Sequence, residues 1–72
     1  MSNLSKNIKH LRTLKKLTQE SLAEELLVTR SRISSYEENR AKPPISFIID
    51  LSNYVNISID ILLKEKLDNL EV

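Results

Sequence analysis

The chain has 72 residues, enough for one small domain, and its formal net charge is +1, which by itself says little about partners. It contains no cysteine and a single histidine, His10, so the sequence predicts neither a disulfide nor a metal site. No apolar run approaches the roughly 20 residues of a membrane span, and the first residues lack the apolar core of a signal peptide, so we expect a soluble cytoplasmic protein with no membrane partner.

Two helices are predicted before residue 27. Apolar side chains recur at helical spacing among lysines at Leu4, Ile8 and Leu11. This spacing predicts an amphipathic helix over about residues 2–15. Thr18 is a favourable N-cap residue and precedes a second predicted helix over residues 19–26. The inward side of that second helix carries Leu22, Ala23 and Leu26.

The stretch VTRSRISSYE, residues 28–37, predicts a third helix that begins at Arg30. Thr29 is its N-cap, and Val28 and Ile33 stand at the two positions of a hydrophobic staple. With Ile33 inward and a step of about 100° per residue, Tyr36 and Glu37 fall on the core side. The opposite side is short, hydrogen-bonding and cationic, and is formed by Arg30, Ser31, Arg32, Ser34 and Ser35.

Two further helices complete the predicted fold. A polar, proline-ended connection over residues 39–44 leads to a fourth helix over residues 45–55. Asn56 tolerates the left-handed conformation that ends a helix, and Ser58 caps a fifth helix from Ile59 onward. No strand pattern competes strongly. Five helices joined by short turns predict an all-α protein, a compact five-helix bundle.

Charge is distributed unevenly along the chain. Residues 1–17 carry five basic side chains and no acidic one, whereas residues 18–29 carry three acidic side chains and no basic one. Residues 30–42 are basic again, and residues 43–72 are acidic. Such asymmetry suits a protein that turns a basic face towards a polyanion. The outward side of the third helix also fits a DNA major groove, because arginine bonds guanine O6 and N7 together and serine pairs with donors or acceptors.

The order and spacing of these elements match the pattern of a known family. The matching stretches are LTQESLAEEL at 17–26, VTRSRISSYE at 28–37, and NISIDILL at 56–63. With them, residues 8–63 resemble the helix-turn-helix domain of phage repressors and Cro proteins, the XRE-type family of bacterial regulators. The resemblance implies a lambda-repressor-like fold in which the second and third helices form the helix-turn-helix. It also implies a sequence-specific transcriptional regulator, most simply a repressor, that is bacterial or phage-encoded and associates with the nucleoid.

The resemblance implies roles for particular residues. Base contact is implied for Arg30, Ser31, Ser34 and Ser35, and contact with either a base or a phosphate for Arg32. Phosphate contact is implied for Gln19, Thr29, Asn39, Arg40 and Lys42, with Gln19 either reaching a phosphate or bracing the recognition helix. An ion pair is implied between Arg12 and Glu37, tying the first helix to the end of the third. The partner is double-stranded DNA, and no cofactor or small-molecule ligand is expected.

The chain departs from the family pattern in having no glycine. The family favours glycine at four turn positions, which here are Lys16, Leu27, Asn39 and Asn56. Asparagine tolerates positive φ, but a left-handed leucine costs on the order of 1 kcal/mol relative to glycine. At Leu27, therefore, the turn is strained, burial of the side chain offsets the strain, or the turn geometry differs.

The end of the chain leaves two interpretations open. We divide it into a helix-turn-helix domain over residues 1–64 and an extension or tail over residues 65–72. Leu63, Leu67 and Leu70 lie at helical spacing, so a continued helix would present apolar side chains for a homodimer contact. The other interpretation is a frayed tail, or a linker to a region outside this sequence. A dimer would address DNA half-sites roughly 34 Å apart.

A second class of function remains open alongside DNA binding. The chain could be a helical protein-interaction module, such as an antitoxin or anti-repressor component, because serines are less committed base readers than asparagine or glutamine. An enzyme is not expected, since the sequence offers no serine–histidine–acid set and no glycine-rich phosphate loop. The operator sequence, and the choice between repression and activation, cannot be read from the residues.

Overall fold

A computed structural model of the chain describes residues 3–67, and five α-helices make up most of this part. Their bounds are α1 Leu4–Leu14, α2 Gln19–Leu26, α3 Arg30–Glu37, α4 Ile45–Val55 and α5 Ile59–Lys64. Residues 3–67 contain no β-strand. The predicted all-α class is therefore confirmed, and the bounds of α2, α3 and α4 are those that the sequence predicts.

The start signals of three helices act as the sequence predicts. The side-chain oxygens of Thr18, Thr29 and Ser58 each accept a hydrogen bond from the backbone amide three residues later. The donor–acceptor distances are 3.0 Å, 3.2 Å and 3.3 Å, respectively. Each cap satisfies one of the amides that the first turn of a helix leaves without a partner. These caps fix where α2, α3 and α5 begin.

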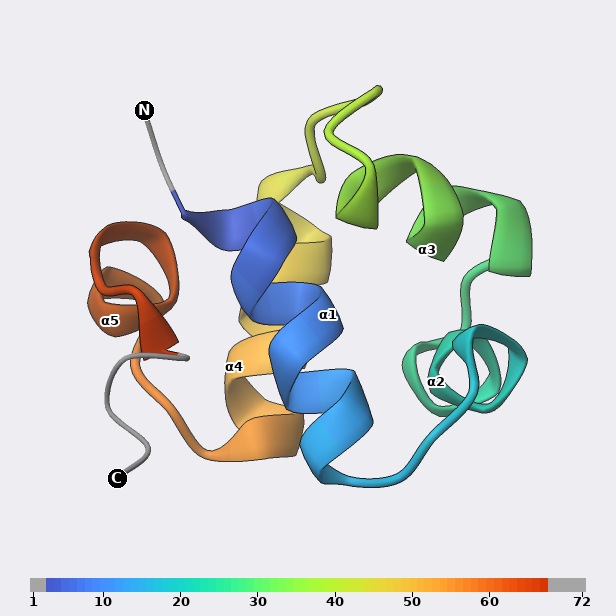
Figure 1. Ribbon diagram of the computed structural model, residues 1–72, viewed down its shortest axis with the longest axis horizontal. Coiled ribbons are helices and arrows are strands. Elements are labelled where there is room, and N and C mark those ends of the chain that lie inside the picture. Colours follow the sequence, from blue (N-terminus) through green and yellow to red (C-terminus); the bar gives the residue numbers. More distant parts are fainter. Residues whose placement is uncertain (1–2, 68–72) are drawn as a thin grey trace.

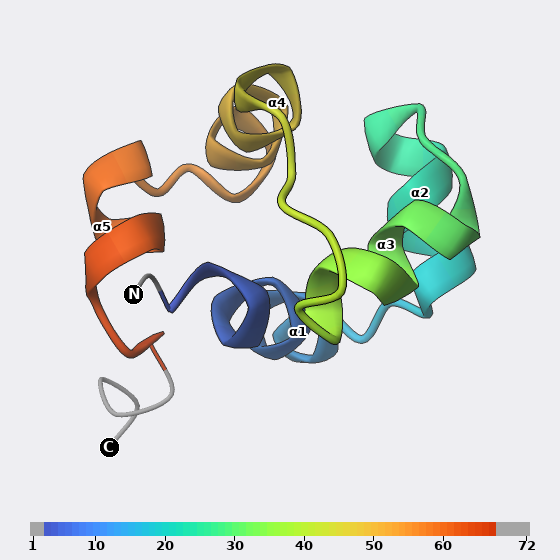
Figure 2. The same ribbon diagram turned by 90° about the horizontal axis from the view of Figure 1, so that it is seen from above.

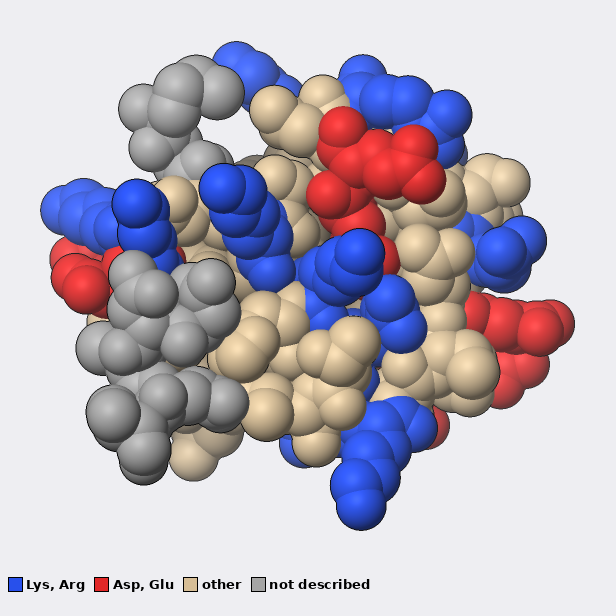
Figure 3. Space-filling model, viewed as in Figure 1, with Lys and Arg blue, Asp and Glu red and all other residues tan. Residues whose placement is uncertain are grey.

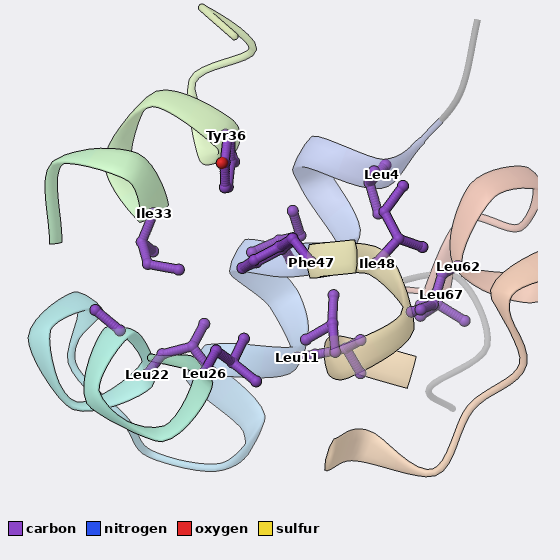
Figure 4. Close-up of a cluster of buried hydrophobic side chains, with 13 residues drawn as sticks. Leu4, Leu11, Leu22, Leu26, Ile33, Tyr36, Phe47, Ile48, Leu62 and Leu67 are labelled. Carbon is purple, nitrogen blue, oxygen red and sulfur yellow. The ribbon is translucent and has the colours of Figure 1, made fainter. Parts of the chain in front are cut away.

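α1 and α4 lie in the centre, and the other three helices flank them (Figure 1). α1 and α4 run through the middle, with α5 on one side and the α2–α3 pair on the other, and the view from above agrees (Figure 2). Side chains from all five helices converge between them (Figure 4). Each helix contributes one apolar side chain that is at most 1% exposed: Ile8, Leu22, Ile33, Leu51 and Leu62.

The C-terminal end of the described chain differs from the predicted continuation of α5. α5 ends at Lys64, and Leu67 lies in the chain's own core with 7% of its surface exposed. The interpretation of Leu67 as a dimer contact required a continued helix, and that condition is not met at Leu67. Leu63 is partly buried against the same core, and Leu70 lies outside the described residues.

A buried asparagine explains why the chain turns back here. Asn7 of α1 is 1% exposed, and its side-chain amide donates to the carbonyls of Leu62 at 2.8 Å and Glu65 at 2.7 Å. Its side-chain oxygen accepts the backbone amide of Leu67 at 3.1 Å. The polar atoms of this buried side chain are thus paired with backbone groups, which satisfies the end of α5. Leu67 is therefore joined to α1 by packing and by this hydrogen bond.

Four turns contain a residue at positive φ. Lys16, Leu27, Asn39 and Asn56 all have φ near 59° or 58°, so all four positions where the family favours glycine require the left-handed conformation. Leu27 is the extreme case, because its side chain is 91% exposed. Burial therefore does not offset the strain at this turn between α2 and α3.

Among residues 3–67, no helix is long and apolar enough to cross a membrane. The same residues contain no cluster of three or more His, Cys, Asp or Glu side chains that would hold a metal ion.

Replacing Leu27 with glycine should stabilise the fold by up to about 1 kcal/mol, because glycine has no Cβ to strain the left-handed turn. Denaturant unfolding of the purified chain measures this change. Leu27→Ala is the matched control, since it shortens the side chain but keeps the Cβ, and it should leave the free energy of unfolding almost unchanged. A loss above about 2 kcal/mol for Leu27→Gly would mean that Leu27 packs as a core residue.

Candidate nucleic-acid interface

α3 is held by its inner side, which leaves its outer side open. Ile33 is 0% exposed and Tyr36 is 4% exposed, and the Tyr36 ring packs against Phe47 of α4 with ring centroids 4.8 Å apart. α3 also packs along α2, where the small side chain of Ala23 is buried at 3% exposure. These contacts fix both the position of α3 and its rotation about its own axis.

The outer side of α3 carries the side chains that the sequence assigns to it. Arg30, Ser31 and Arg32 are exposed, and Ser34 and Ser35 are half-buried. The exposed first turn is formed by hydroxyl and guanidinium groups. Glu37, in the last turn, points inward. Guanidinium offers a planar fork of donors, and short serine side chains allow another surface to approach the helix backbone closely.

A surface hollow of about 350 Å³ lies beside this outer side. Its walls come from α3 and from the connection to α4, with Ser31, Arg32 and Ser35 on one side and Lys42 on the other. The fold thus brings candidate base-contact residues and a candidate phosphate-contact residue to the edges of one depression. Two cationic side chains, Arg32 and Lys42, stand at the edges of this hollow.

A buried carboxylate ties α3 to α1 and α2. The guanidinium of Arg12 donates to Glu37 through Nε at 2.6 Å and through a terminal nitrogen at 3.1 Å. Gln19, the first residue of α2, donates to the same carboxylate at 3.0 Å. The side chains of Arg12 and Glu37 are only 13% and 3% exposed, and Arg12 also donates to the carbonyl of Leu17 at 2.8 Å. The expected ion pair is present, and Gln19 braces α3 through the same carboxylate.

A second, exposed cluster lies at the end of α3. The hydroxyl of Ser34 donates to Glu38 at 3.3 Å and accepts from the guanidinium of Arg40 at 3.3 Å. Arg40 also forms an ion pair with Glu38 at 3.3 Å, with side chains 61% and 57% exposed. Figure 3 shows acidic side chains over this end of α3 with basic side chains on either side. The fold thus links a candidate base contact, Ser34, to a candidate phosphate contact, Arg40.

Sequence reasoning did not single out Glu38. The spacing could have indicated its contacts, because Glu38 follows Ser34 by four residues and precedes Arg40 by two. Side chains four apart on a helix are neighbours. The remaining candidates flank α3: Thr29 caps its start, whereas Asn39 and Lys42 are exposed beyond its end.

Comparison with known proteins places this geometry in a family. A helix-turn-helix family model matches residues 8–62. YqaE of Bacillus subtilis (strain 168), named an uncharacterized HTH-type transcriptional regulator, is 40% identical over 60 residues, which cover 83% of this chain and 52% of YqaE. The chain spans about half the length, or less, of the curated relatives it matches.

Solved structures give the same result. The N-terminal DNA binding domain of SinR from Bacillus subtilis superposes with a TM-score of 0.79 at 34% identity, covering 88% of this chain and 93% of that domain. The P22 c2 repressor in complex with a synthetic operator superposes with a TM-score of 0.79 at 28% identity, covering 85% of this chain and 92% of the repressor chain.

Breaking the pair between Arg12 and Glu37 should destabilise the fold strongly. We expect Arg12→Met or Glu37→Leu alone to lower the free energy of unfolding by about 3–5 kcal/mol, because each leaves a buried charge without its partner. The double variant should lose less than the two single losses added together. Urea unfolding of the four proteins measures the coupling, and strictly additive losses would contradict it. Asp60→Asn is the control, because its exposed pair with Lys64 should contribute at most about 1 kcal/mol.

Proposed function

Since the chain belongs to the helix-turn-helix family of transcriptional regulators, we propose that it binds double-stranded DNA sequence-specifically, with α3 in the major groove. The observation that carries the proposal is the outer side of α3, where Arg30, Ser31 and Arg32 are exposed while Ile33 and Tyr36 anchor the helix in the core. Groove-reading helices of this class contact bases through their N-terminal residues. The proposed role is binding without catalysis.

Base recognition is assigned mainly to the first turn of α3. An arginine at this position pairs with guanine O6 and N7, and the serines pair with donors or acceptors on other bases. Arg30 and Arg32 supply the paired guanidinium donors, while Ser31 and Ser35 lie between them and face the groove. Ser34 is also on this side, but its hydroxyl is shared with Glu38 and Arg40 in the protein alone.

Phosphate contact is assigned to residues on both sides of α3. Gln19 and Thr29 lie at the starts of α2 and α3, where helix amides and the helix dipole favour an anion. Asn39, Arg40 and Lys42 lie beyond the end of α3. Contacts at both ends of the recognition helix would set its position in the groove without selecting sequence.

We propose that two copies act together as a repressor. One recognition helix covers few base pairs, and a two-fold dimer doubles the sequence that is read. The similarity to the P22 c2 repressor, which is bound to its operator, favours repression. Of the apolar residues predicted to join the copies, Leu63 remains partly accessible. A protein of this function would act in the cytoplasm, with the bacterial or phage DNA that it regulates.

Selection of bound sequences from a random DNA pool tests base recognition directly. Arg30→Ala should relax the preference at one base position, at a cost of about 1–3 kcal/mol, because one bidentate contact is lost. Lys42→Ala should weaken all sequences alike and reduce the slope of log K against log salt by about 0.9, the value for one phosphate contact. Lys64→Ala, which removes an equally exposed lysine from α5, is the control and should change neither measurement.

A folded protein that binds no duplex at low salt would contradict the proposal. Binding that hardly depends on salt would instead favour a protein-interaction module, since counterion release accompanies phosphate contact.

A further inference from the structure

Three side chains at the end of α3 form a closed triangle of polar contacts. Ser34, Glu38 and Arg40 contact one another pairwise, and each of the three distances is 3.3 Å. Two of the three are candidate DNA contacts, and the third is a carboxylate. In the protein alone, therefore, a carboxylate of the chain itself pairs with the guanidinium group that is a candidate contact for a DNA phosphate.

The backbone holds this triangle in place. Glu38 is the C-cap of α3, and its amide donates to the carbonyl of Ser34 at 3.0 Å. Asn39 turns the chain at φ 58°, and the amide of Arg40 donates back to the carbonyl of Ser35 at 2.9 Å. This left-handed helix ending brings Arg40 back over the last turn of α3. The turn thus brings the side chains of Glu38 and Arg40 within reach of each other.

We propose that Glu38 acts as an internal phosphate mimic, which competes with the DNA backbone for Arg40 and so weakens the binding of every duplex. This inference rests on the proposed function. Carboxylate and phosphate are both anions that accept hydrogen bonds from a guanidinium group. Glu38 pairs with Arg40 at Nε, and a terminal nitrogen of Arg40 donates to Ser34, so a phosphate that takes this side of the guanidinium group must displace both contacts.

The exposure of the pair makes the competition reversible. Because both side chains are more than half exposed, solvent screens their attraction, and such pairs are weak. A DNA phosphate can therefore displace Glu38, but the displaced carboxylate is then left near other phosphates. The penalty falls on backbone contact, which does not depend on sequence, and it leaves Arg30 and Arg32 at the other end of α3 untouched.

The competition sets how tightly the protein holds DNA of any sequence. Non-specific binding depends almost entirely on phosphate contacts. A penalty on one such contact lowers the affinity for target and non-target duplexes alike, and it leaves the ratio of the two affinities to the base contacts at the start of α3. Glu38 is therefore assigned a role in limiting the total occupancy of DNA.

The test measures binding of a mixed-sequence duplex of about 20 base pairs as a function of salt concentration. Four proteins are compared: the wild type, Glu38→Gln, Arg40→Ala and the double variant. We expect Glu38→Gln to bind about two- to fivefold more tightly at low salt, the range for an exposed ion pair. Its slope of log K against log salt should change by less than the value of about 0.9 for one phosphate contact, because a phosphate reaches Arg40 in both proteins. In the Arg40→Ala background the same change should give little of the gain in affinity.

Asp60→Asn is the matched control for charge. It removes one acidic charge from an exposed pair with Lys64 on α5, at a distance of 3.6 Å, and changes the net charge by the same amount. A gain in Glu38→Gln no larger than that in Asp60→Asn would overturn the inference. An equal gain with and without Arg40 would also overturn it, since it would show simple repulsion between Glu38 and DNA.

Failure of the proposed function gives a different result. In that case the wild type and all variants would bind no duplex at low salt, although circular dichroism shows them folded. Because Glu38 is exposed, its substitution should hardly change the unfolding temperature. If Glu38→Gln does not fold, Glu38→Ala supports the same comparison with Arg40→Ala.

Discussion

The carboxylate of Glu37 is the contact on which the geometry of the α2–α3 unit depends. It accepts hydrogen bonds from Arg12 of α1 and Gln19 of α2, so three helices meet at one nearly buried anion. Apolar packing of Ile33 and Tyr36 presses α3 onto the core, but such packing is non-directional. The bidentate pair adds direction, because guanidinium and carboxylate align in one plane. Together they leave the outer side of α3 with little freedom to rotate.

The tight turns impose a second constraint, because they connect the helices without any glycine. All four turn residues at positive φ carry a Cβ, and two of them, Lys16 and Leu27, lack the asparagine side chain that tolerates this conformation. The strain persists because each turn lies between helices whose packing fixes both ends. The turn at Leu27 sets the angle between α2 and α3, so strain is accepted at the point where the helix-turn-helix geometry is determined. The strained turn at Leu27 thus links the stability of the fold to the angle between α2 and α3.

Local chemistry predicts much of this structure, and long-range contacts account for the rest. Thr18, Thr29 and Ser58 act within three residues of themselves, so their caps, and with them the helix starts, can be predicted from sequence. The burial of Leu67 depends on Asn7, sixty residues away along the chain, and no local pattern distinguishes it from an exposed tail. The Glu38 cluster escapes prediction for another reason: three exposed polar side chains have many alternatives in water, and the positive φ of Asn39 selects this one.

The placement of the charged side chains explains how a chain with a net charge of only +1 can present a cationic surface beside α3. The two carboxylates nearest the end of α3 are both engaged with arginines, Glu37 in the interior and Glu38 at the surface. Glu37 and Arg12 pair in the interior, so their opposite charges largely cancel for an approaching phosphate. Glu38 remains in that field and offsets Arg40. The excess positive charge on this side of α3 therefore lies at Arg30, Arg32 and Lys42, and the last two line the hollow beside the outer face of the helix. Under the proposed function, this positive charge lies beside the candidate base contacts, so the attraction that brings DNA to the surface would also place it against the residues proposed to distinguish one sequence from another.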